Sequence, residues 1–353
     1  MADYKNAPRL SRRSLLNVSA SVAAGLATAG AIAQTGCSPP PKSVLGGLRF
    51  AFIVKTVNSD YWRTCLDGGR HAAEQLGLDA LQFTGANSEA NIQQQIELVE
   101  DALAKRLDFL VLAPTSSTAL DNVINKASQS GVKVILIDSA ANTDDYVSFL
   151  ATDNHAGGQL AAKTLAEAIK KKTGAAAGQV AYSTFLSGVG SLTLRDNGFL
   201  EGLKAYPGLE VVAHKDAAGD QSVKPIGIVA DTLSRFPHLV GYFADSLITL
   251  QGAVTAFREN RVDSTKVSLV GFDPTPQLVR DLSAGRIDGI ILQDQYQMGY
   301  GGVAYGLLAA AGLEMPKFIN TGVTAATPQN VGAADIQGLL NPSKQTRVGL
   351  RAS

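Results

Sequence analysis

The sequence predicts an α/β protein of two lobes, each built on a doubly wound parallel β-sheet with helices on both faces. Two observations support this fold class. Short, nearly continuous apolar runs bounded by turn residues recur about ten times from residue 48 onward, and segments with helical periodicity lie between most of them. A third observation divides the chain. One open sheet of about ten parallel strands would be unusually large, so two sheets of about five or six strands each are expected.

The apolar runs are the expected strands. They cover residues 48–54, 79–83, 108–114, 133–138, 147–153, 179–185, 209–214, 239–245, 266–273 and 288–294. Because these runs are apolar at nearly every position, they are typical of parallel strands that are covered on both faces. Helical periodicity is clear in 90–105 and 154–171. We expect the chain to pass from one sheet to the other near residues 151–154.

Composition excludes several classes of function. The 353 residues suffice for two domains, and 45% hydrophobic with 18% charged residues is ordinary for a globular protein. The 31 basic residues are balanced by 31 acidic ones, which argues against general electrostatic binding of nucleic acid. Two cysteines, Cys37 and Cys65, build neither a disulfide framework nor a cysteine zinc site. The four scattered histidines argue against a multi-histidine metal centre, and no cofactor is expected.

The N-terminus has the layout of a bacterial export signal. Residues 11–33 contain Arg12 and Arg13, which suggest the twin-arginine variant, followed by a modestly apolar run rich in Ala, Gly and Ser. Two processing sites stay open: cleavage after Ala33, or a lipoprotein-like site that leaves Cys37 acylated. We therefore expect an export signal over 1–37, a linker over 38–47, and a periplasmic or extracytoplasmic protein, with a lipid anchor through Cys37 as an open alternative.

Polar side chains collect where the expected strands end. In open α/β sheets, ligands bind at the carboxyl ends of the strands, so this edge is the predicted functional face. The residues found there are Lys55, Thr56, Thr115, Ser116, Ser117, Asp138, Ser139, Asp153, Asn154, Asp245, Ser246, Asp273, Gln293 and Asp294.

Catalytic and metal chemistry find little support in the sequence. Asp138, Asp245 and Asp273 follow separate strands with no histidine nearby, which disfavours general acid–base work. Cys65 and His71 are six residues apart on one expected helix and would not face each other, so Cys65 is interpreted as a packing residue. The GVGS stretch at 188–191 lacks the Lys-Ser/Thr of a phosphate-binding loop. No catalytic or metal-binding residue is expected.

The stretch VKTVNSDYW at 54–62 points to a sugar ligand. It puts Lys55 and small polar groups beside two adjacent aromatics, Tyr61 and Trp62, directly after an expected strand. Binding pockets combine apolar walls with a few placed polar groups. An aromatic face packs on the C–H face of a sugar ring, while mixed donors and acceptors bond its hydroxyls. One of the two aromatics is also expected to pack against the core.

Several ordered motifs resemble the ribose/allose-type periplasmic sugar-binding proteins of bacterial ABC importers, which have the type I periplasmic binding protein fold. The likeness covers about residues 48–340. Its motifs are FIVKTVNSDYW (52–62), VILIDS (134–139), ATDNHAGG (151–158), LRDNGF (194–199), VGFDPTP (270–276) and IILQDQ (290–295). The KT…YW pattern is closest to the hexose-binding members.

The resemblance implies roles for individual residues. It makes Lys55 a donor to ring hydroxyls, Tyr61 and Trp62 a stacking pair, and Arg195 a contribution from the second lobe. It makes Asp138, Asp273 and Gln293 hydroxyl-binding groups. The full expected ligand-binding set is Lys55, Asn58, Ser59, Tyr61, Trp62, Asp138, Ser139, Arg195, Ser246, Asp273 and Gln293.

The chain also departs from the family pattern. Ser59 and Ser246 stand where ribose binders have asparagines, Ser139 replaces an arginine, and Gly219 falls where an aromatic usually covers the other sugar face. A pocket that has lost long donors is roomier or differently shaped, and sites built for particular hydroxyls reject analogues that lack them. Ribose, another sugar, a polyol and a larger sugar derivative all stay open as ligands.

These features predict a binding protein and not an enzyme. We expect an N-terminal lobe of 48–152 plus 294–321, a C-terminal lobe of 153–293 plus 322–343, and a tail of 344–353. A three-stranded hinge would join the lobes and close them on a sugar in the cleft. The closed form would dock on an inner-membrane permease powered by its ATPase. The alternative is a protein that presents ligand to a chemoreceptor or sensor kinase. A carbohydrate-modifying hydrolase is a weaker candidate, and the export signal argues against a LacI-type repressor.

Overall fold

The structure is a computed structural model that describes residues 47–220 and 223–342. The expected export signal with Cys37, nearly all of the linker and the tail lie outside the described residues. The chain divides into two compact units. The N-terminal unit runs to Ala151 and includes Gln295–Thr321, and the C-terminal unit comprises Thr152–Asp294 and the chain from Gly322 onward. The lobes expected from the sequence differ from these units by one residue at the first two crossings.

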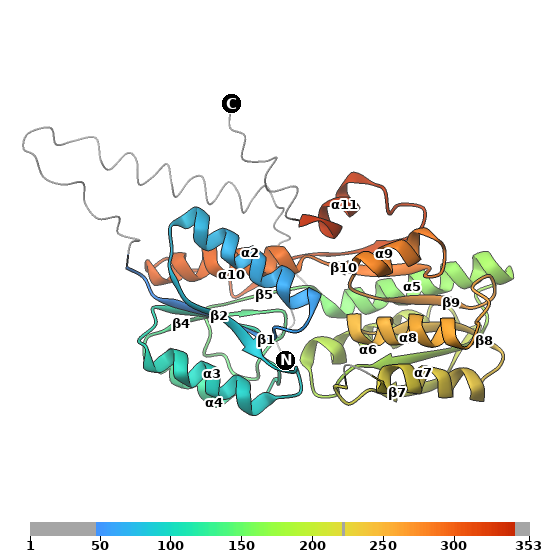
Figure 1. Ribbon diagram of the computed structural model, residues 1–353, viewed down its shortest axis with the longest axis horizontal. Coiled ribbons are helices and arrows are strands. Elements are labelled where there is room, and N and C mark those ends of the chain that lie inside the picture. Colours follow the sequence, from blue (N-terminus) through green and yellow to red (C-terminus); the bar gives the residue numbers. More distant parts are fainter. Residues whose placement is uncertain (1–46, 221–222, 343–353) are drawn as a thin grey trace, which may run out of the picture. The chain divides into compact units, whose positions relative to one another are not determined.

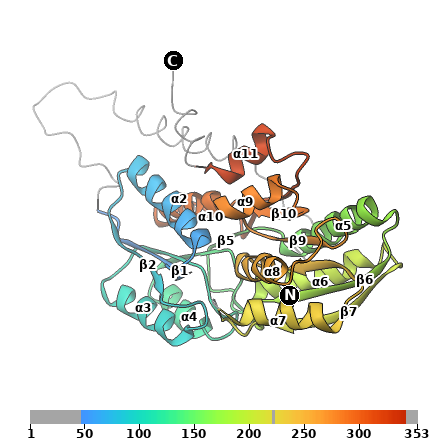
Figure 2. The same ribbon diagram turned by 45° about the vertical axis from the view of Figure 1, so that its right-hand side comes forward.

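The N-terminal unit is a six-stranded parallel sheet covered by helices on both faces. Its strand order is β11-β5-β4-β3-β1-β2. The strands are β1 (Phe50–Thr56), β2 (Ala80–Ala86), β3 (Phe109–Leu112), β4 (Lys133–Ile137), β5 (Ser148–Ala151) and β11 (Phe318–Asn320). One face carries α2 (Asp60–Leu76) and α10 (Gln295–Ala310), and the other carries α3 (Ile92–Ala104) and α4 (Asp121–Gln129) (Figures 1 and 2).

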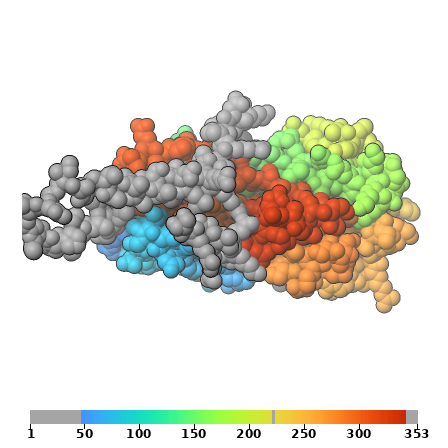
Figure 3. Space-filling view, turned by 90° about the horizontal axis from the view of Figure 1, so that it is seen from above, coloured from blue at the N-terminus to red at the C-terminus, as the bar shows by residue number. Residues whose placement is uncertain are grey.

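The C-terminal unit repeats this plan with one change. Its six-stranded sheet has the order β12-β10-β9-β8-β6-β7, and β12 pairs antiparallel with β10. The strands are β6 (Gly178–Thr184), β7 (Leu209–Asp216), β8 (Leu239–Ala244), β9 (Ser268–Phe272), β10 (Gly289–Gln293) and β12 (Val323–Ala326). The helices are α5 (Asn154–Thr173), α6 (Gly190–Leu203), α7 (Lys224–Arg235), α8 (Leu247–Glu259), α9 (Pro276–Ser283) and α11 (Ala334–Leu340). Seen from above, the red segment with α11 lies against the green and orange parts of this unit (Figure 3).

This architecture confirms the predicted fold class, and all ten apolar runs contain strands. Two details differ. The sequence did not predict β11 and β12, which are only three and four residues long. The expectation that every strand is covered on both faces is wrong for β2 and β7, because they are edge strands and most of their side chains are partly or fully exposed.

Glycines bring α2 close to α10 in the N-terminal unit. A Cβ added to Gly68 would overlap the carbonyl oxygen of Tyr296, and one added to Gly299 would overlap that of Cys65. The two helix backbones are therefore in direct contact. Since Tyr61 and Trp62 lie in the first turn of α2, this packing fixes the position of the helix that carries the aromatic pair.

The C-terminal unit uses the same device between α5 and α6. A Cβ on Gly158 would overlap the carbonyl oxygen of Arg195, and one on Gly198 would overlap that of His155. This contact explains the glycines of the ATDNHAGG and LRDNGF motifs, and it places Arg195 on a helix that cannot shift outward without losing its packing.

Among the helices that the structure describes, none is long and apolar enough to cross a membrane.

Candidate functional site

Lys55, Asp138 and Ser139 form a closed triangle at the strand ends of the N-terminal unit. Lys55 lies near the end of β1, and Asp138 follows β4, one strand away across β3. The Lys55 Nζ atom is 2.9 Å from Asp138 Oδ2 and donates to Ser139 Oγ at 2.8 Å, while Ser139 Oγ donates to Asp138 Oδ2 at 2.9 Å. All three side chains are buried. The ammonium is thus fixed in place and its charge is compensated.

The aromatic pair continues this cluster. Tyr61 OH donates to Asp138 Oδ1 at 2.7 Å, and Trp62 Nε1 donates to Glu89 Oε1 at 2.7 Å. The two rings meet edge to face with centroids 4.8 Å apart, and Lys55 Nζ lies 5.4 Å from the Trp62 ring centroid. Each ring is therefore held both by a polar anchor and by its neighbours.

Asn58 and Ser59 lie on the loop between β1 and α2. Asn58 is exposed, and its Nδ2 donates to the carbonyl oxygen of Asn87 at 2.8 Å. Ser59 is the buried N-cap residue of α2, but its hydroxyl makes no capping bond. Their role in ligand binding stays a prediction.

Arg195 is the centre of the corresponding cluster in the C-terminal unit. Its Nε donates to Asn154 Oδ1 at 2.8 Å, and its Nη1 donates to the carbonyl oxygen of Asp245 at 2.9 Å. The guanidinium carbon lies 4.1 Å from the centroid of the Phe272 ring, and Nη1 is 3.9 Å from Asp273 Oδ2. Arg195 is thus fixed by bonds in two directions and stacked on an aromatic face.

Gln293 joins this cluster through Asp273. Its Nε2 donates to Oδ1 and Oδ2 of Asp273 at 3.0 and 3.2 Å. Within the described residues, the buried Gln293 Oε1 has no hydrogen-bond partner. A buried acceptor without a partner is costly, and a ligand hydroxyl could satisfy it.

Asp138 and Asp273 occupy equivalent positions in the two units. Each follows a strand and has a left-handed backbone, with φ of 65° and 67°. Each donates its amide to a carbonyl of the next strand, to Leu150 at 2.9 Å and to Ile291 at 3.0 Å. Both carboxylates also face a cation that lies beside an aromatic ring. Each unit therefore presents a buried cation, a carboxylate and an aromatic ring at its strand ends.

Two of the positions that depart from the family pattern have identifiable local structural features. Ser246 is the N-cap residue of α8 and forms a capping box with Thr249, so its hydroxyl caps the N-terminus of the helix. Gly219 follows β7 with φ of 75°, a left-handed backbone that disfavours any residue with a Cβ. An aromatic side chain at this position would be strained.

Two carboxyl groups near Arg195 have raised pKa values. Burial raises the pKa of Asp245 well above its usual range, and the nearby Asp196 raises it further. Burial also raises the pKa of Asp196 to about 6, although a hydrogen bond from Thr184 and the charge of Arg195 oppose the shift. The charge of Arg195 opposes both shifts, but burial prevails and both carboxyl groups have raised pKa values.

The structure brings most of the expected site residues together within their own units. It joins Lys55, Tyr61, Trp62, Asp138 and Ser139 in one, and Arg195, Asp273 and Gln293 in the other. Sequence reasoning missed Glu89 and Phe272. The strand-end rule, applied to β2, points to residues 87–89. Phe272 ends an apolar run, and nothing in the sequence separates it from core residues.

Cys65 lies within the core of the N-terminal unit. Its side chain is fully buried, and this burial raises the pKa of the thiol well above its ordinary value of 9.0. His71 contacts Tyr296 instead, with Nδ1 2.5 Å from the phenol oxygen. A buried, protonated thiol without a base is no nucleophile.

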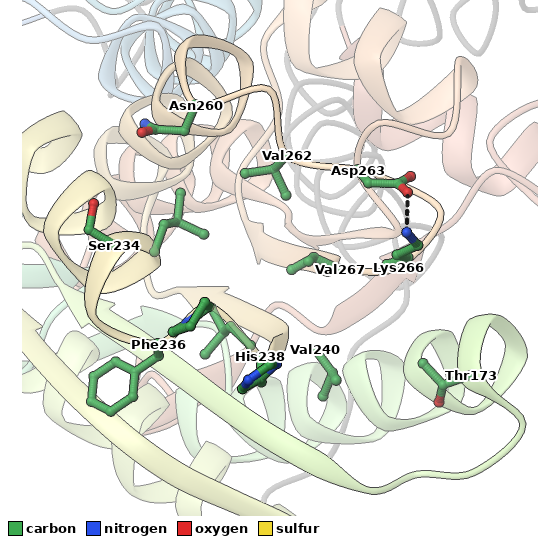
Figure 4. Close-up of a pocket in the computed structure, with 13 residues that line it drawn as sticks. Thr173, Ser234, Phe236, His238, Val240, Asn260, Val262, Asp263, Lys266 and Val267 are labelled. Atoms are coloured by element: carbon green, nitrogen blue, oxygen red, sulfur yellow. Dashed lines mark ion pairs between the residues drawn. The ribbon is translucent and has the colours of Figure 1, made fainter.

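The C-terminal unit also has a groove of about 610 Å³ away from the carboxyl ends of its strands (Figure 4). It lies at the amino ends of β8 and β9, where Leu239, Val240 and Val267 line it. Its charged residues, Asp263 and Lys266, pair with each other at 3.3 Å. The groove offers no converging set of polar groups.

Comparison with known proteins shows which family the chain resembles. Residues 50–314 match the family model described as periplasmic binding protein domain. The ribose import binding protein of Escherichia coli (strain K12) is 28% identical over 253 residues, which cover 72% of this chain and 81% of that protein.

Two solved structures are also similar. A carbohydrate transporter solute binding protein from Agrobacterium radiobacter, in complex with D-arabinose, has a TM-score of 0.81 and 38% identity, covering 84% of this chain and 100% of its own. An ABC transporter solute binding protein from Agrobacterium vitis with bound D-fucose has a TM-score of 0.77 and 31% identity, covering 83% and 99%. The family match covers most of the chain, and the chain therefore belongs to the periplasmic binding protein family.

Proposed function

We propose that this protein is the substrate-binding component of an ABC importer, and that it binds a neutral monosaccharide or related polyol. The observation that carries the proposal is the matched pair of clusters. Each unit presents a buried cation already paired with a carboxylate, next to an aromatic ring. Because the charges are compensated, the clusters favour a ligand with hydroxyls over one with a net charge.

The remaining hydrogen-bonding capacity suits hydroxyl groups. Lys55 has three N–H donors and uses two of them, one on Asp138 and one on Ser139, which leaves one within the described contacts. Gln293 Oε1 supplies an unused acceptor. Both groups are held by neighbours before any ligand arrives, which reduces the entropy cost of binding.

The relatives support the ligand class. The two similar structures hold D-arabinose and D-fucose, and the Escherichia coli relative is named for ribose import. All three are neutral monosaccharides. We infer that the expected eleven-residue set binds such a sugar, with contributions from both units. Capture by hinge closure, a periplasmic location and delivery to a permease are parts of the same proposal. No observation favours presentation to a chemoreceptor or sensor kinase over transport.

The test is a ligand screen on the purified protein. D-arabinose, D-fucose, D-ribose, D-allose and sorbitol would be titrated by calorimetry, with gluconate and ribose 5-phosphate as charged competitors. We expect saturable binding of at least one neutral compound and none of the charged ones. Lys126→Met, which removes an exposed ion pair to Glu100 at 3.5 Å, is the control variant and should bind like the wild type. Binding of a charged compound alone would overturn the proposal.

A further inference from the structure

The indole of Trp62 is anchored by a residue from a different element. Its Nε1 donates to Glu89 Oε1 at 2.7 Å, and the tryptophan is only 2% exposed. Glu89 lies on the loop between β2 and α3, whereas Trp62 lies in the first turn of α2. The indole N–H is the only polar group of the side chain, and a buried indole N–H usually has a partner.

We propose that Glu89 is a positioning residue that sets the orientation of the Trp62 ring and through it the affinity for sugar. This inference rests on the proposed function and adds a residue to it. The ring also meets Tyr61 edge to face and has Lys55 near its centroid. Both are bonded to Asp138, so they fix the ring relative to β4. Glu89 supplies an anchor from the loop after β2, a strand that lies on the other side of β1 from β4.

The loop that carries Glu89 is itself held at both ends. Asn91 caps α3 by accepting from the Gln94 amide at 3.2 Å, and the amide of Asn87 donates to Gln94 Oε1 at 2.8 Å. Asn58 ties this loop to the one before α2 by its bond to the Asn87 carbonyl oxygen. A carboxylate on a loop fixed in this way can impose an orientation on the ring instead of following it. The same contacts give Asn58 a supporting role behind Trp62.

Charge adds to the geometry. A hydrogen bond to a carboxylate is about twice as strong as one between neutral groups. Hence Glu89→Gln keeps an acceptor and should weaken sugar binding less than Glu89→Ala, which leaves the buried N–H without a partner. Loss of a hydrogen bond to a charged group costs enough to lower affinity about tenfold. Glu97, an exposed glutamate on α3 bonded to Gln93, offers a matched control, and Glu97→Ala should not change affinity.

The test uses the fact that Trp62 is the only tryptophan of the chain. Its emission reports on the ring in the sugar-free protein. Glu89→Ala should shift that emission and make iodide quenching more effective, whereas Glu97→Ala should change neither. Unchanged emission and quenching in Glu89→Ala would overturn the inference, whatever the outcome for sugar binding.

A double-mutant cycle separates positioning from direct contact. With D-arabinose, or whichever sugar the screen identifies, Glu89→Ala should weaken binding about tenfold in the wild type and by less than about twofold in a Trp62→Phe background. An equal loss in both backgrounds would show that Glu89 touches the sugar and would refute a role through Trp62. If the wild type binds no sugar at all, the proposed function fails. The emission test then still decides whether Glu89 orients the ring.

Discussion

Replacing Asp138 with asparagine tests the central ion pair of the N-terminal unit. The carboxylate of Asp138 compensates the buried ammonium of Lys55 at 2.9 Å and accepts from Tyr61 and Ser139. Asparagine tolerates the left-handed backbone at this position and keeps one acceptor, so the change isolates the loss of charge. Removing one partner of a buried pair costs about 3–5 kcal/mol, because the other charge is left uncompensated. We expect the lower end of this range, about 3 kcal/mol, since the amide oxygen still accepts a hydrogen bond.

Chemical denaturation followed by circular dichroism measures this loss. The double variant Lys55→Met/Asp138→Asn should recover most of the unfolding free energy, because it removes both charges, but it should not recover sugar binding. Stability and binding are thereby separated. If Asp138→Asn unfolds like the wild type, the ion pair contributes nothing and the account of the cluster is wrong.

Three further outcomes follow from the structure. Asp196 has its pKa raised from 3.8 to about 6, so between these pH values the native state binds a proton that the unfolded chain does not. The contribution of Asp196 to the unfolding free energy is therefore present below pH 4 and falls by about 3 kcal/mol as the pH rises past 6. The difference in unfolding free energy between wild type and Asp196→Asn should change by most of that amount between pH 4 and 7, and a constant difference would contradict the pKa. Gly198→Ala should lower the melting temperature and weaken sugar binding, because the added methyl meets the His155 carbonyl oxygen; a variant with unchanged melting and affinity would show that α6 can move. In a Cys37→Ser variant, Cys65 should react with Ellman's reagent only after unfolding, and rapid labelling of that native variant would contradict its burial.

The fold could be predicted from the sequence because its signal is periodic. Apolar runs such as 108–114 and 133–138 are buried on both faces in the structure, and the helices between them have their own period. β11 and β12 could not be predicted in this way. They are too short to show a period, and they exist because β5 and β10 offer them hydrogen bonds.

The sequence predicted which residues lie at the site better than it predicted the contacts that those residues make. The strand-end rule identified Lys55, Asp138 and Gln293, because parallel strands deliver their final residues to one edge. It could not show what a hydroxyl bonds to: Ser246 caps a helix, and that choice depends on the conformation of its neighbours. Glu89 was missed since its role exists only once α2 and the β2–α3 loop come together.

Calorimetry on three proteins, with the neutral sugar that the ligand screen identifies, tests the central claim most directly. The claim is that a neutral sugar is bound by groups from both units at once. We predict one-to-one binding to the wild type and loss of binding in both Lys55→Met and Arg195→Met, each of which removes the cation of one cluster. If the wild type binds the sugar and either variant still binds it, a shared site is contradicted. Binding of gluconate in place of the neutral sugars would contradict the ligand class.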